Sequence, residues 1–294
     1  MRTIGAIFAL SAALLGACSA NAATRHLRVL IIDGQNNHNW RETTPALKRI
    51  LEDTGLFEVD VLTAPPRGAD MNSFKPVFKN YKVIVSNYNG DPWPERAKAD
   101  FEKYMRHGGG FVCYHAADNA FPEWHEYNLM IGMGGWEGRN ENAGPFWHYN
   151  DGKLIADQTP GPAGKHGERK PFKVTNRDTK NPITDGLPVE WMHSADELYS
   201  RLRGPGQNVT LLSTAFSDPT NRGSGHDEPM LMTIRYGRGR IFHTTLGHDL
   251  EAMRCVGFIV TLQRGTEWAA TGKVTQTVPI DFPSGNAVSS RPLN

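Results

Sequence analysis

The chain has 294 residues and a formal net charge of +1 at pH 7, with 32 basic against 31 acidic side chains. A charge so close to zero produces no field that would attract nucleic acid or an acidic membrane surface, so neither is expected as a partner. With only three cysteines, the chain cannot be built on a framework of disulfides.

The N-terminal segment has the composition of an export signal. After a short basic start, residues 4–17 are almost all apolar or small. This run is too short for a stable membrane span and is typical of a signal-peptide core. Two processing sites overlap: a lipobox that would make Cys18 a lipid anchor, and a small-x-small site that ends at Ala22. We therefore predict a signal peptide over residues 1–22 and a mature protein that is periplasmic or anchored to the outer membrane.

The rest of the chain alternates apolar runs with helical patterns, which is typical of a parallel α/β sheet. In chain order the pattern predicts a strand over 27–32, a helix over 43–54, strands over 57–62 and 81–88, a helix over 94–107, strands over 109–115, 172–174 and 209–215, a hairpin of 230–235 with 240–246, and a helix over 250–263. Residues 132–170 show no clear periodicity and are interpreted as an ordered excursion that is functional or covers the domain. Residues 273–294 are expected to form an extended tail.

Two cysteines follow the predicted signal peptide. Cys113 lies within an apolar run and is expected to be a small core residue. A single bridge between Cys113 and Cys255 would be stable in an oxidising compartment, and the sequence leaves that alternative open.

Polar and aromatic residues follow the predicted strands at several points. In an open parallel sheet, ligands bind beyond the carboxyl ends of the strands. The candidates are His38 and Trp40 after the first strand, Asn87 after the third, His115 and Asp118 at the end of the fourth, and His248 and Asp249 after the hairpin. Amides and carboxylates hydrogen-bond hydroxyl groups, and an indole stacks on the apolar face of a sugar ring. The plainer alternative is that these loops are polar only because loops usually are.

Two histidines are candidates for proton transfer. His115 ends an apolar strand at a turn like that of a nucleophile elbow, where an imidazole can be a general base, a proton donor or a metal ligand. The alternative is a hydrogen-bonded histidine at a strand end. His248 precedes Asp249, which either supports the charge of the imidazole or caps the following helix.

A third candidate is Glu197, which ends a short run, residues 193–197, holding two carboxylates and an imidazole. The run either belongs to the site or begins a solvated helix. His243 lies inside a predicted strand and is expected to be structural.

A metal site is compatible with the histidines, since imidazole and carboxylate suit zinc and similar divalent ions. His38, His115 and His248 would be its ligands, although no H-E-x-x-H spacing is present. The chain also contains no dinucleotide fingerprint, no P-loop and no G-x-S-x-G elbow. Nucleotide binding and serine-esterase chemistry are therefore not expected.

Several of these segments resemble the trehalose-utilization (ThuA-like) family. The resemblance is carried by GGGFVCYHAA at 108–117, PITDGLP at 182–188, DELY at 196–199, DEP at 227–229, YGRGRIFHTTLGH at 236–248, and His38. It spans roughly residues 27–272 and implies one α/β domain. The implied fold is doubly wound and flavodoxin-like, of the class I glutamine-amidotransferase-like type, with a mostly parallel sheet and helices on both faces. His115 takes the place of the cysteine nucleophile of true amidotransferases, so glutamine hydrolysis is not expected.

The resemblance further implies use of disaccharides, including routes through 3-keto sugars. The leading hypothesis is an exported enzyme of carbohydrate catabolism that uses acid–base chemistry (hydrolysis, elimination or isomerisation) on a disaccharide, glycoside or 3-keto sugar. Its catalytic residues would be His115, His248 and Glu197, and its substrate-binding residues His38, Trp40, Asn87, Asp118 and Asp249.

Two alternatives remain open: a non-catalytic sugar-binding envelope lipoprotein and a metal-dependent hydrolase. The sequence requires no cofactor, although a divalent metal such as zinc fits the residues. The expected partner is a small carbohydrate, and self-association into a homo-oligomer stays open.

Overall fold

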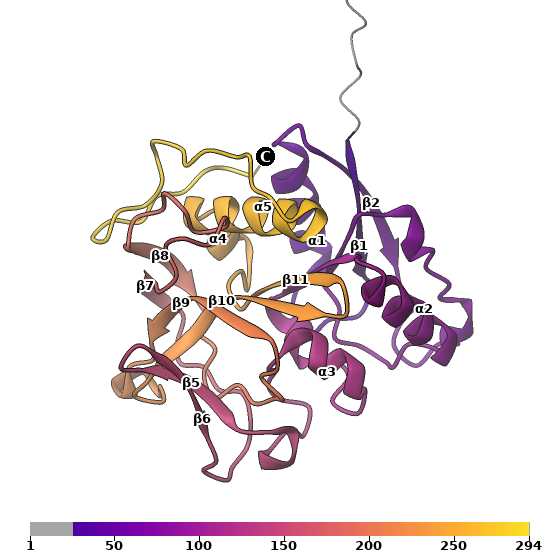
Figure 1. Ribbon diagram of the computed structural model, residues 1–294, viewed down its shortest axis with the longest axis horizontal. Helices are drawn as coiled ribbons and strands as arrows, with labels where there is room; N and C mark the ends of the chain where they lie inside the picture. The colour runs from indigo at the N-terminus through magenta and orange to yellow at the C-terminus, as the bar shows by residue number, and fades with distance from the viewer. Residues whose placement is uncertain (1–25, 294) are drawn as a thin grey trace, which may run out of the picture.

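An eleven-stranded mixed sheet runs through the computed structural model, which describes residues 26–293 (Figure 1). Its main strand order is β2-β1-β3-β4-β11-β10-β9-β7-β8, with β5 and β6 attached beside β10. The predicted signal peptide, residues 1–22 with Cys18, lies outside the described residues.

One half of the sheet is parallel. Its strands are β1 (Leu27–Asp33), β2 (Phe57–Thr63), β3 (Val83–Ser86), β4 (Gly110–Tyr114) and β11 (Gly239–Thr244). All four pairings within this group are parallel. The inner strands are buried on both faces, which makes their sequences continuous apolar runs. This is why the sequence pattern located them within a few residues.

The other half is antiparallel. It contains β10 (Asp227–Tyr236), β9 (Val209–Phe216), β7 (Lys170–Asn176), β8 (Glu190–Asp196), β5 (Phe146–Asn150) and β6 (Lys153–Asp157). The hairpin of β10 with β11 reverses the strand direction, as predicted for this segment, and every later pairing is antiparallel. The prediction of a mostly parallel sheet is therefore correct for only half of it, because an apolar run does not reveal the direction of its strand.

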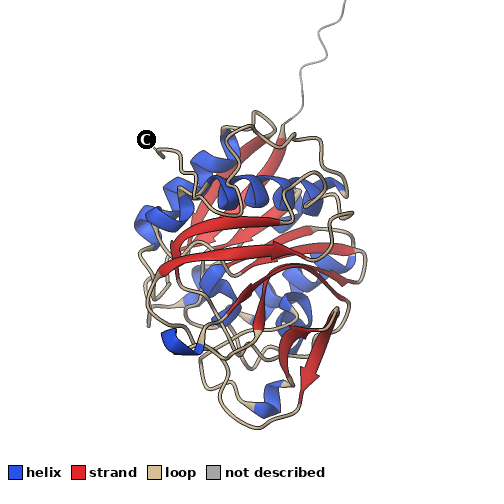
Figure 2. Cartoon of the chain, turned by 90° about the vertical axis from the view of Figure 1, so that its left-hand side faces the viewer, coloured by secondary structure: helices blue, strands red, loops and turns tan. Residues whose placement is uncertain are grey.

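Helices cover both faces of the sheet (Figure 2). One face packs against α1 (Trp40–Glu52), α4 (Leu250–Met253) and α5 (Val256–Thr271), and the other against α2 (Glu95–Arg106) and α3 (His125–Ile131). The alternation within β1 follows these layers, since Val29 and Ile31 join the first apolar cluster and Leu30 and Ile32 the second. The predicted helix over 250–263 is two helices that meet at Cys255.

Both cysteines of the described chain are buried and free. Cys113 belongs to the apolar cluster on one face of the sheet, and Cys255 to the cluster on the other face. The sheet itself therefore separates the two thiols, and the bridge left open by the sequence does not form.

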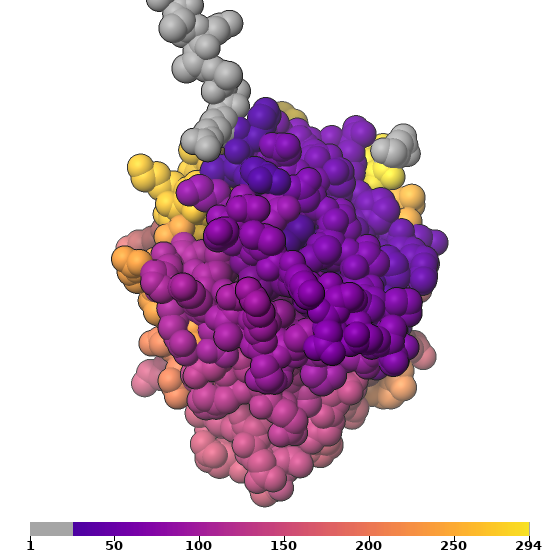
Figure 3. Space-filling view, turned by 90° about the vertical axis from the view of Figure 1, so that its right-hand side faces the viewer, coloured from indigo at the N-terminus to yellow at the C-terminus, as the bar shows by residue number. Residues whose placement is uncertain are grey.

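The segment over 132–170 is ordered and contains β5 and β6. Figure 3 shows the middle of the chain forming a narrow end of the molecule. Residues 273–293 contain no helix or strand and run beside β8 and α5, where Met192 N donates to Ser284 O and Val256 N to Ser289 O. None of the helices in residues 26–293 is both long and apolar enough to cross a bilayer.

Candidate functional site

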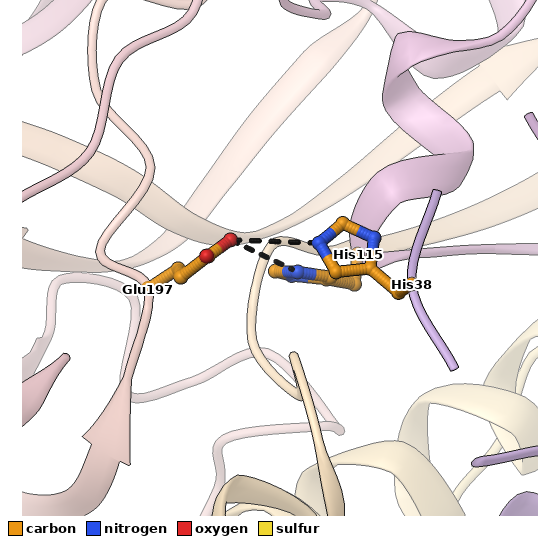
Figure 4. A group of neighbouring side chains, drawn as sticks. All are labelled: His38, His115 and Glu197. Carbon is orange, nitrogen blue, oxygen red and sulfur yellow. Dashed lines mark ion pairs between the residues drawn. The ribbon is translucent and has the colours of Figure 1, made fainter. Parts of the chain in front are cut away.

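Four imidazoles surround the carboxylate of Glu197. The Nε2 atoms of His38 and His115 lie 3.6 and 3.8 Å from Oε2, and those of His166 and His248 lie 3.6 and 3.2 Å from Oε1. Figure 4 shows the Glu197 carboxylate directed at the rings of His38 and His115. These five residues, called the histidine cluster below, come from loops that are far apart in the chain. The rule that ligands bind beyond the carboxyl ends of parallel strands predicted three of these loops.

His115 is held in an unusual backbone conformation. It begins the 3-10 helix η3 (His115–Asn119) directly after β4, with φ at 44°, a region that non-glycine residues rarely occupy. Its Nδ1 lies 2.6 Å from Thr245 O, which can only accept, so Nδ1 carries the proton. Its Nε2 is therefore unprotonated and accepts a hydrogen bond from the Tyr199 hydroxyl at 3.0 Å.

The electrostatic environment keeps His115 neutral. Burial, reinforced by the nearby His38, lowers the pKa of His115 to about 3. An imidazole with this pKa is a weak base at neutral pH, but its unprotonated Nε2 would bind a metal ion if the Tyr199 hydroxyl that it now accepts from turned away. The geometry therefore favours His115 as a ligand or acceptor over the role of general base that the sequence suggested.

The other imidazoles are oriented in a similar way. His38 Nδ1 lies 3.2 Å from Asn36 Oδ1, His166 Nδ1 lies 2.9 Å from Gly167 O, and His248 Nδ1 lies 3.5 Å from Asp249 Oδ2. His38 and His166 thus have an oxygen within hydrogen-bond reach of Nδ1, whereas His248 Nδ1 makes no hydrogen bond to Asp249, and all three rings direct Nε2 at Glu197. Histidines that bind metals show this arrangement, because an acceptor at one nitrogen fixes the tautomer and the ring.

Glu197 is charged within this cluster. Burial works to raise its pKa, but the nearby His38 and the other surrounding imidazoles outweigh burial and bring the pKa below its ordinary value. His248, at the solvent side of the cluster, has a pKa lowered by burial, which Glu197 partly opposes. The cluster therefore combines the charged carboxylate of Glu197 with two imidazoles, those of His115 and His248, whose lowered pKa values favour the neutral form.

The buried carboxylate of Asp196 fixes the two segments that carry Glu197 and His248. Its Oδ1 accepts from the backbone N–H of Glu197 at 2.8 Å and of His248 at 3.1 Å. Its Oδ2 accepts from Gly247 N at 2.7 Å and from His193 Nε2 at 2.8 Å. Burial opposes protonation of His193, but Cys255 and Asp196 outweigh burial and raise the pKa of His193 to about 10. Asp196 is therefore paired with a buried cation.

Gly247 is required where this loop turns. Its φ is 105°, and a Cβ at this position would lie 2.6 Å from the ring of Phe258 and 2.7 Å from that of Tyr114. Only glycine lets the backbone pass between these rings and reach Asp196.

Other predicted site residues lie around the cluster without belonging to it. Trp40 begins α1 and is partly exposed, with the Arg41 guanidinium carbon 4.3 Å from the ring centre. Asp249 caps α4 by accepting from Glu251 N and Ala252 N, and also pairs with Arg169. Asp249 thus performs the capping role that the sequence left open.

Two predicted substrate-binding residues are buried instead. The Asn87 amide donates to the hydroxyls of Thr43 and Thr44 and accepts from Asn36, so its polar atoms support the loop of His38. Asp118 is fully buried, with Oδ2 3.4 Å from His243 Nε2. The structure therefore places neither side chain where it would contact a substrate at the cluster.

The cluster fits a divalent metal. Ligand atoms of His38, His115 and Glu197 all lie within 4.8 Å of one another. Around a tetrahedral zinc ion with ligand distances of roughly 2.0–2.2 Å, the ligand atoms lie about 3.3 Å apart, so small side-chain movements would close the set. His248 or His166 would supply a fourth ligand.

Comparison with known proteins identifies the family. The sequence model of the trehalose utilisation family, ThuA, matches residues 28–269. The chain belongs to the ThuA family. The structure is similar to that of a ThuA-like protein from Parabacteroides merdae ATCC 43184, with 50% identity and a TM-score of 0.89 over 91% of this chain and 98% of the other. It shares its fold with a ThuA-like protein from Bacteroides uniformis ATCC 8492, with 20% identity and a TM-score of 0.53 over 87% and 96% of the two chains. No curated protein matches.

Membership of the ThuA family connects the chain with carbohydrate metabolism. Within the site, sequence reasoning missed two residues. His166 lies in the stretch without periodicity, where no pattern distinguishes it from a surface histidine. Tyr199 ends one of the family motifs, but its contact with His115 depends on folding.

We predict that Asp196→Asn strongly destabilises the protein. The substitution removes the carboxylate that pairs with His193 and accepts from three backbone N–H groups, and breaking a buried pair in this way costs about 3–5 kcal/mol. Urea unfolding measures the change in the free energy of unfolding. Asp60→Asn is the matched control, because the exposed pair of Asp60 with Arg28 contributes at most about 1 kcal/mol. Equal small effects of the two substitutions would contradict the role of Asp196.

We also predict a specific pH dependence from His115. Above pH about 6.5 its imidazole is neutral in both the folded and the unfolded chain and adds no slope. Below that pH, His115 binds a proton in the unfolded chain but stays unprotonated in the native protein until the pH approaches its native pKa of about 3. The free energy of unfolding therefore falls by up to about 1.4 kcal/mol for each pH unit.

Urea unfolding between pH 6.5 and 4, with a chelator present to remove bound metal, tests this slope. His115→Gln has no imidazole at this position, so its free energy of unfolding is expected to fall less steeply with decreasing pH. If the free energy of unfolding fell with decreasing pH at the same slope in the variant and the wild type, His115 would have the same pKa in the native and the unfolded chain, which would contradict the prediction.

Proposed function

We propose that this ThuA-family chain is an exported, metal-dependent enzyme that performs acid–base chemistry on a disaccharide, glycoside or 3-keto sugar. The observation that carries the proposal is the convergence of four imidazole Nε2 atoms on the carboxylate of Glu197. A purely sugar-binding protein needs aromatic and amide groups but has no use for this convergence. Family membership supports the choice of a carbohydrate as substrate.

The proposed ligands are His38, His115 and Glu197, with His166 completing the set. A bound divalent ion would polarise a sugar carbonyl or lower the pKa of a bound water. The oxygen acceptors beside Nδ1 of the histidines orient the rings before any ion arrives. Little reorganisation is then needed on binding.

Proton transfer is assigned to His248 and Tyr199. The side chain of His248 is 22% exposed and contacts both Glu197 and Asp249, so it can exchange a proton with substrate and with solvent. The Tyr199 hydroxyl hydrogen-bonds His115 Nε2 and would be released toward a substrate if a metal ion took that nitrogen. Burial keeps the pKa of Tyr199 well above the ordinary value, so the hydroxyl stays protonated and can donate. A neutral imidazole and a hydroxyl donor suit removal of a proton beside a keto group and delivery of one to a departing oxygen.

We further propose that the parallel half of the sheet is doubly wound and flavodoxin-like, of the class I glutamine-amidotransferase-like type. The strand order β2-β1-β3-β4-β11 and the helices on both faces support this assignment. Since His115 takes the place of a cysteine nucleophile, we propose no glutamine hydrolysis.

We predict that turnover requires the metal and the cluster. The assay uses trehalose, sucrose, related glucosides and their 3-keto forms, with the metal content of each preparation measured by elemental analysis. Chelation, Glu197→Gln and His115→Ala are each expected to lower turnover by at least about 100-fold, because a missing ligand removes metal and proton-transfer geometry together.

His125→Ala is the control, because His125 is an exposed histidine at the start of α3. It is expected to keep both the metal and the activity. Full activity in metal-free protein would contradict the proposal that the enzyme depends on a metal. Sugar binding without turnover in the wild type would identify a sugar-binding lipoprotein instead of an enzyme.

We predict that residues 1–22 direct export. Expression of the full chain in a Gram-negative host, followed by mass spectrometry of the envelope fraction, reads the mature N-terminus. A lipid-modified Cys18 would identify an anchored lipoprotein, and a chain beginning at Ala23 would identify a soluble periplasmic form. A chain that keeps residues 1–22 in the cytoplasm would contradict export.

A further inference from the structure

A cavity of about 590 Å³, open to solvent over much of its boundary, lies at Trp136, outside the residues of the histidine cluster. It is formed by two loops, residues 136–141 and 161–164, within the segment whose sequence shows no periodicity. Its volume is in the range of small-molecule sites, which usually combine an aromatic wall with a few placed polar groups. The site described above makes no use of it.

Trp136 joins this cavity to the cluster. Its indole lines the cavity, and its ring centre lies 4.5 Å from that of Tyr199 and 6.0 Å from that of His166. Tyr199 hydrogen-bonds His115, and His166 contacts Glu197. Trp136 therefore separates the cavity from the cluster, and a ligand long enough to extend past this indole from the cluster would reach the cavity.

The two loops are held firmly together. Trp136 N donates to Ala163 O, and Ala163 N donates to Arg139 O. The buried guanidinium of Arg139 donates to the carbonyls of Asn119, Ala120 and Gly135, so its charge is used inside the protein. The cavity is therefore a formed site and not a gap between mobile loops.

The backbone is shaped to present the indole. Trp136 has φ at 50°, which is unusual for a bulky residue. A Cβ on Gly164 would lie 2.6 Å from the Trp136 ring, so only glycine allows the ring to lie against this loop. Strain of this kind persists where the surroundings enforce it, and it is commonest at ligand sites.

The chemistry of the lining selects a class of ligand. The lining also includes Glu137, Asn140 and Glu141. Asn140 Oδ1 accepts from Asn142 N and Glu141 Oε2 accepts from Gly161 N, so the Glu137 carboxylate and the other Glu141 oxygen are the acceptors left for a ligand. An indole face packs on the C–H face of a pyranose, and carboxylate and amide oxygens accept from hydroxyl groups. Because the Arg139 guanidinium is buried and its two terminal nitrogens donate to main-chain carbonyls, the acidic lining repels anions. A neutral sugar ring fits this combination better than a sugar acid or a phosphate.

We propose that the cavity beside Trp136 binds a neutral hexopyranose ring, the sugar unit next to the one that reacts at the histidine cluster. This inference rests on the proposed function for the identity of that neighbouring unit. It assigns Trp136 to substrate specificity and makes disaccharides better ligands than single sugars.

Calorimetric titration of the metal-loaded protein with trehalose, glucose and glucuronic acid tests the subsite. Trp136→Ala is expected to weaken trehalose binding by at least about tenfold, equivalent to about 1.4 kcal/mol. Trp136→Phe, which keeps an aromatic face, should recover most of the affinity. The matched control is Phe216→Ala, which removes an exposed aromatic ring outside the cavity and is expected to leave binding unchanged.

A fluorescence measurement covers the case in which Trp136→Ala does not fold. Trehalose is expected to shift the tryptophan emission of the wild type, and the shift should be absent in Trp136→Phe. An unchanged trehalose affinity in a folded Trp136→Ala protein, or tighter binding of glucuronic acid than of trehalose, would overturn the subsite.

The subsite and the proposed function fail in different ways. If the wild type shows no turnover but binds trehalose in a way that depends on Trp136, the proposed subsite is supported and the proposed enzymatic function is contradicted. If disaccharides are turned over and Trp136→Ala changes neither KM nor kcat, the proposed enzymatic function is supported and the proposed subsite is contradicted.

Discussion

The buried carboxylate of Asp196 is the interaction on which the candidate site depends. A charge buried without partners would cost several kcal/mol, but here three backbone N–H groups and the His193 cation surround it. Those N–H groups belong to the segment after β8 and to the loop after β11. One carboxylate thereby fixes the two backbones from which Glu197 and His248 project, and the convergence of imidazoles on Glu197 depends on that fixation.

The sequence predicted the parallel half of the sheet well and the rest less well, for a physical reason. The strands near Val29 and Val112 are covered by helices on both faces, so their apolar runs stand out. The strand over Glu190–Asp196 lies at the edge of the sheet and carries polar side chains, so its sequence was compatible with a helix start. The hairpin of β5 and β6 has no periodic apolar face and was interpreted only as part of an ordered excursion.

For the site, the strand-end rule found His38, His115 and His248 and could not separate them from supporting residues. Asn87 and Asp118 occupy equivalent positions and are just as polar, yet the fold turns them inward. Polarity indicates that a group needs a partner, and only the packed structure determines whether that partner is protein or ligand. His166 joins the cluster from a stretch with no pattern, which only long-range packing could disclose.

The acceptor beside Nδ1 of His115 is the main-chain carbonyl of Thr245. No exchange of the side chain at position 245 removes that oxygen, in contrast to the acceptor beside His38, which is an asparagine side chain. Which nitrogen of His115 bears hydrogen is therefore inherited with the pairing of β4 and β11. A descendant of this protein could change its substrate by altering the surrounding loops and would still keep Nε2 of His115 as the unprotonated nitrogen at the end of β4.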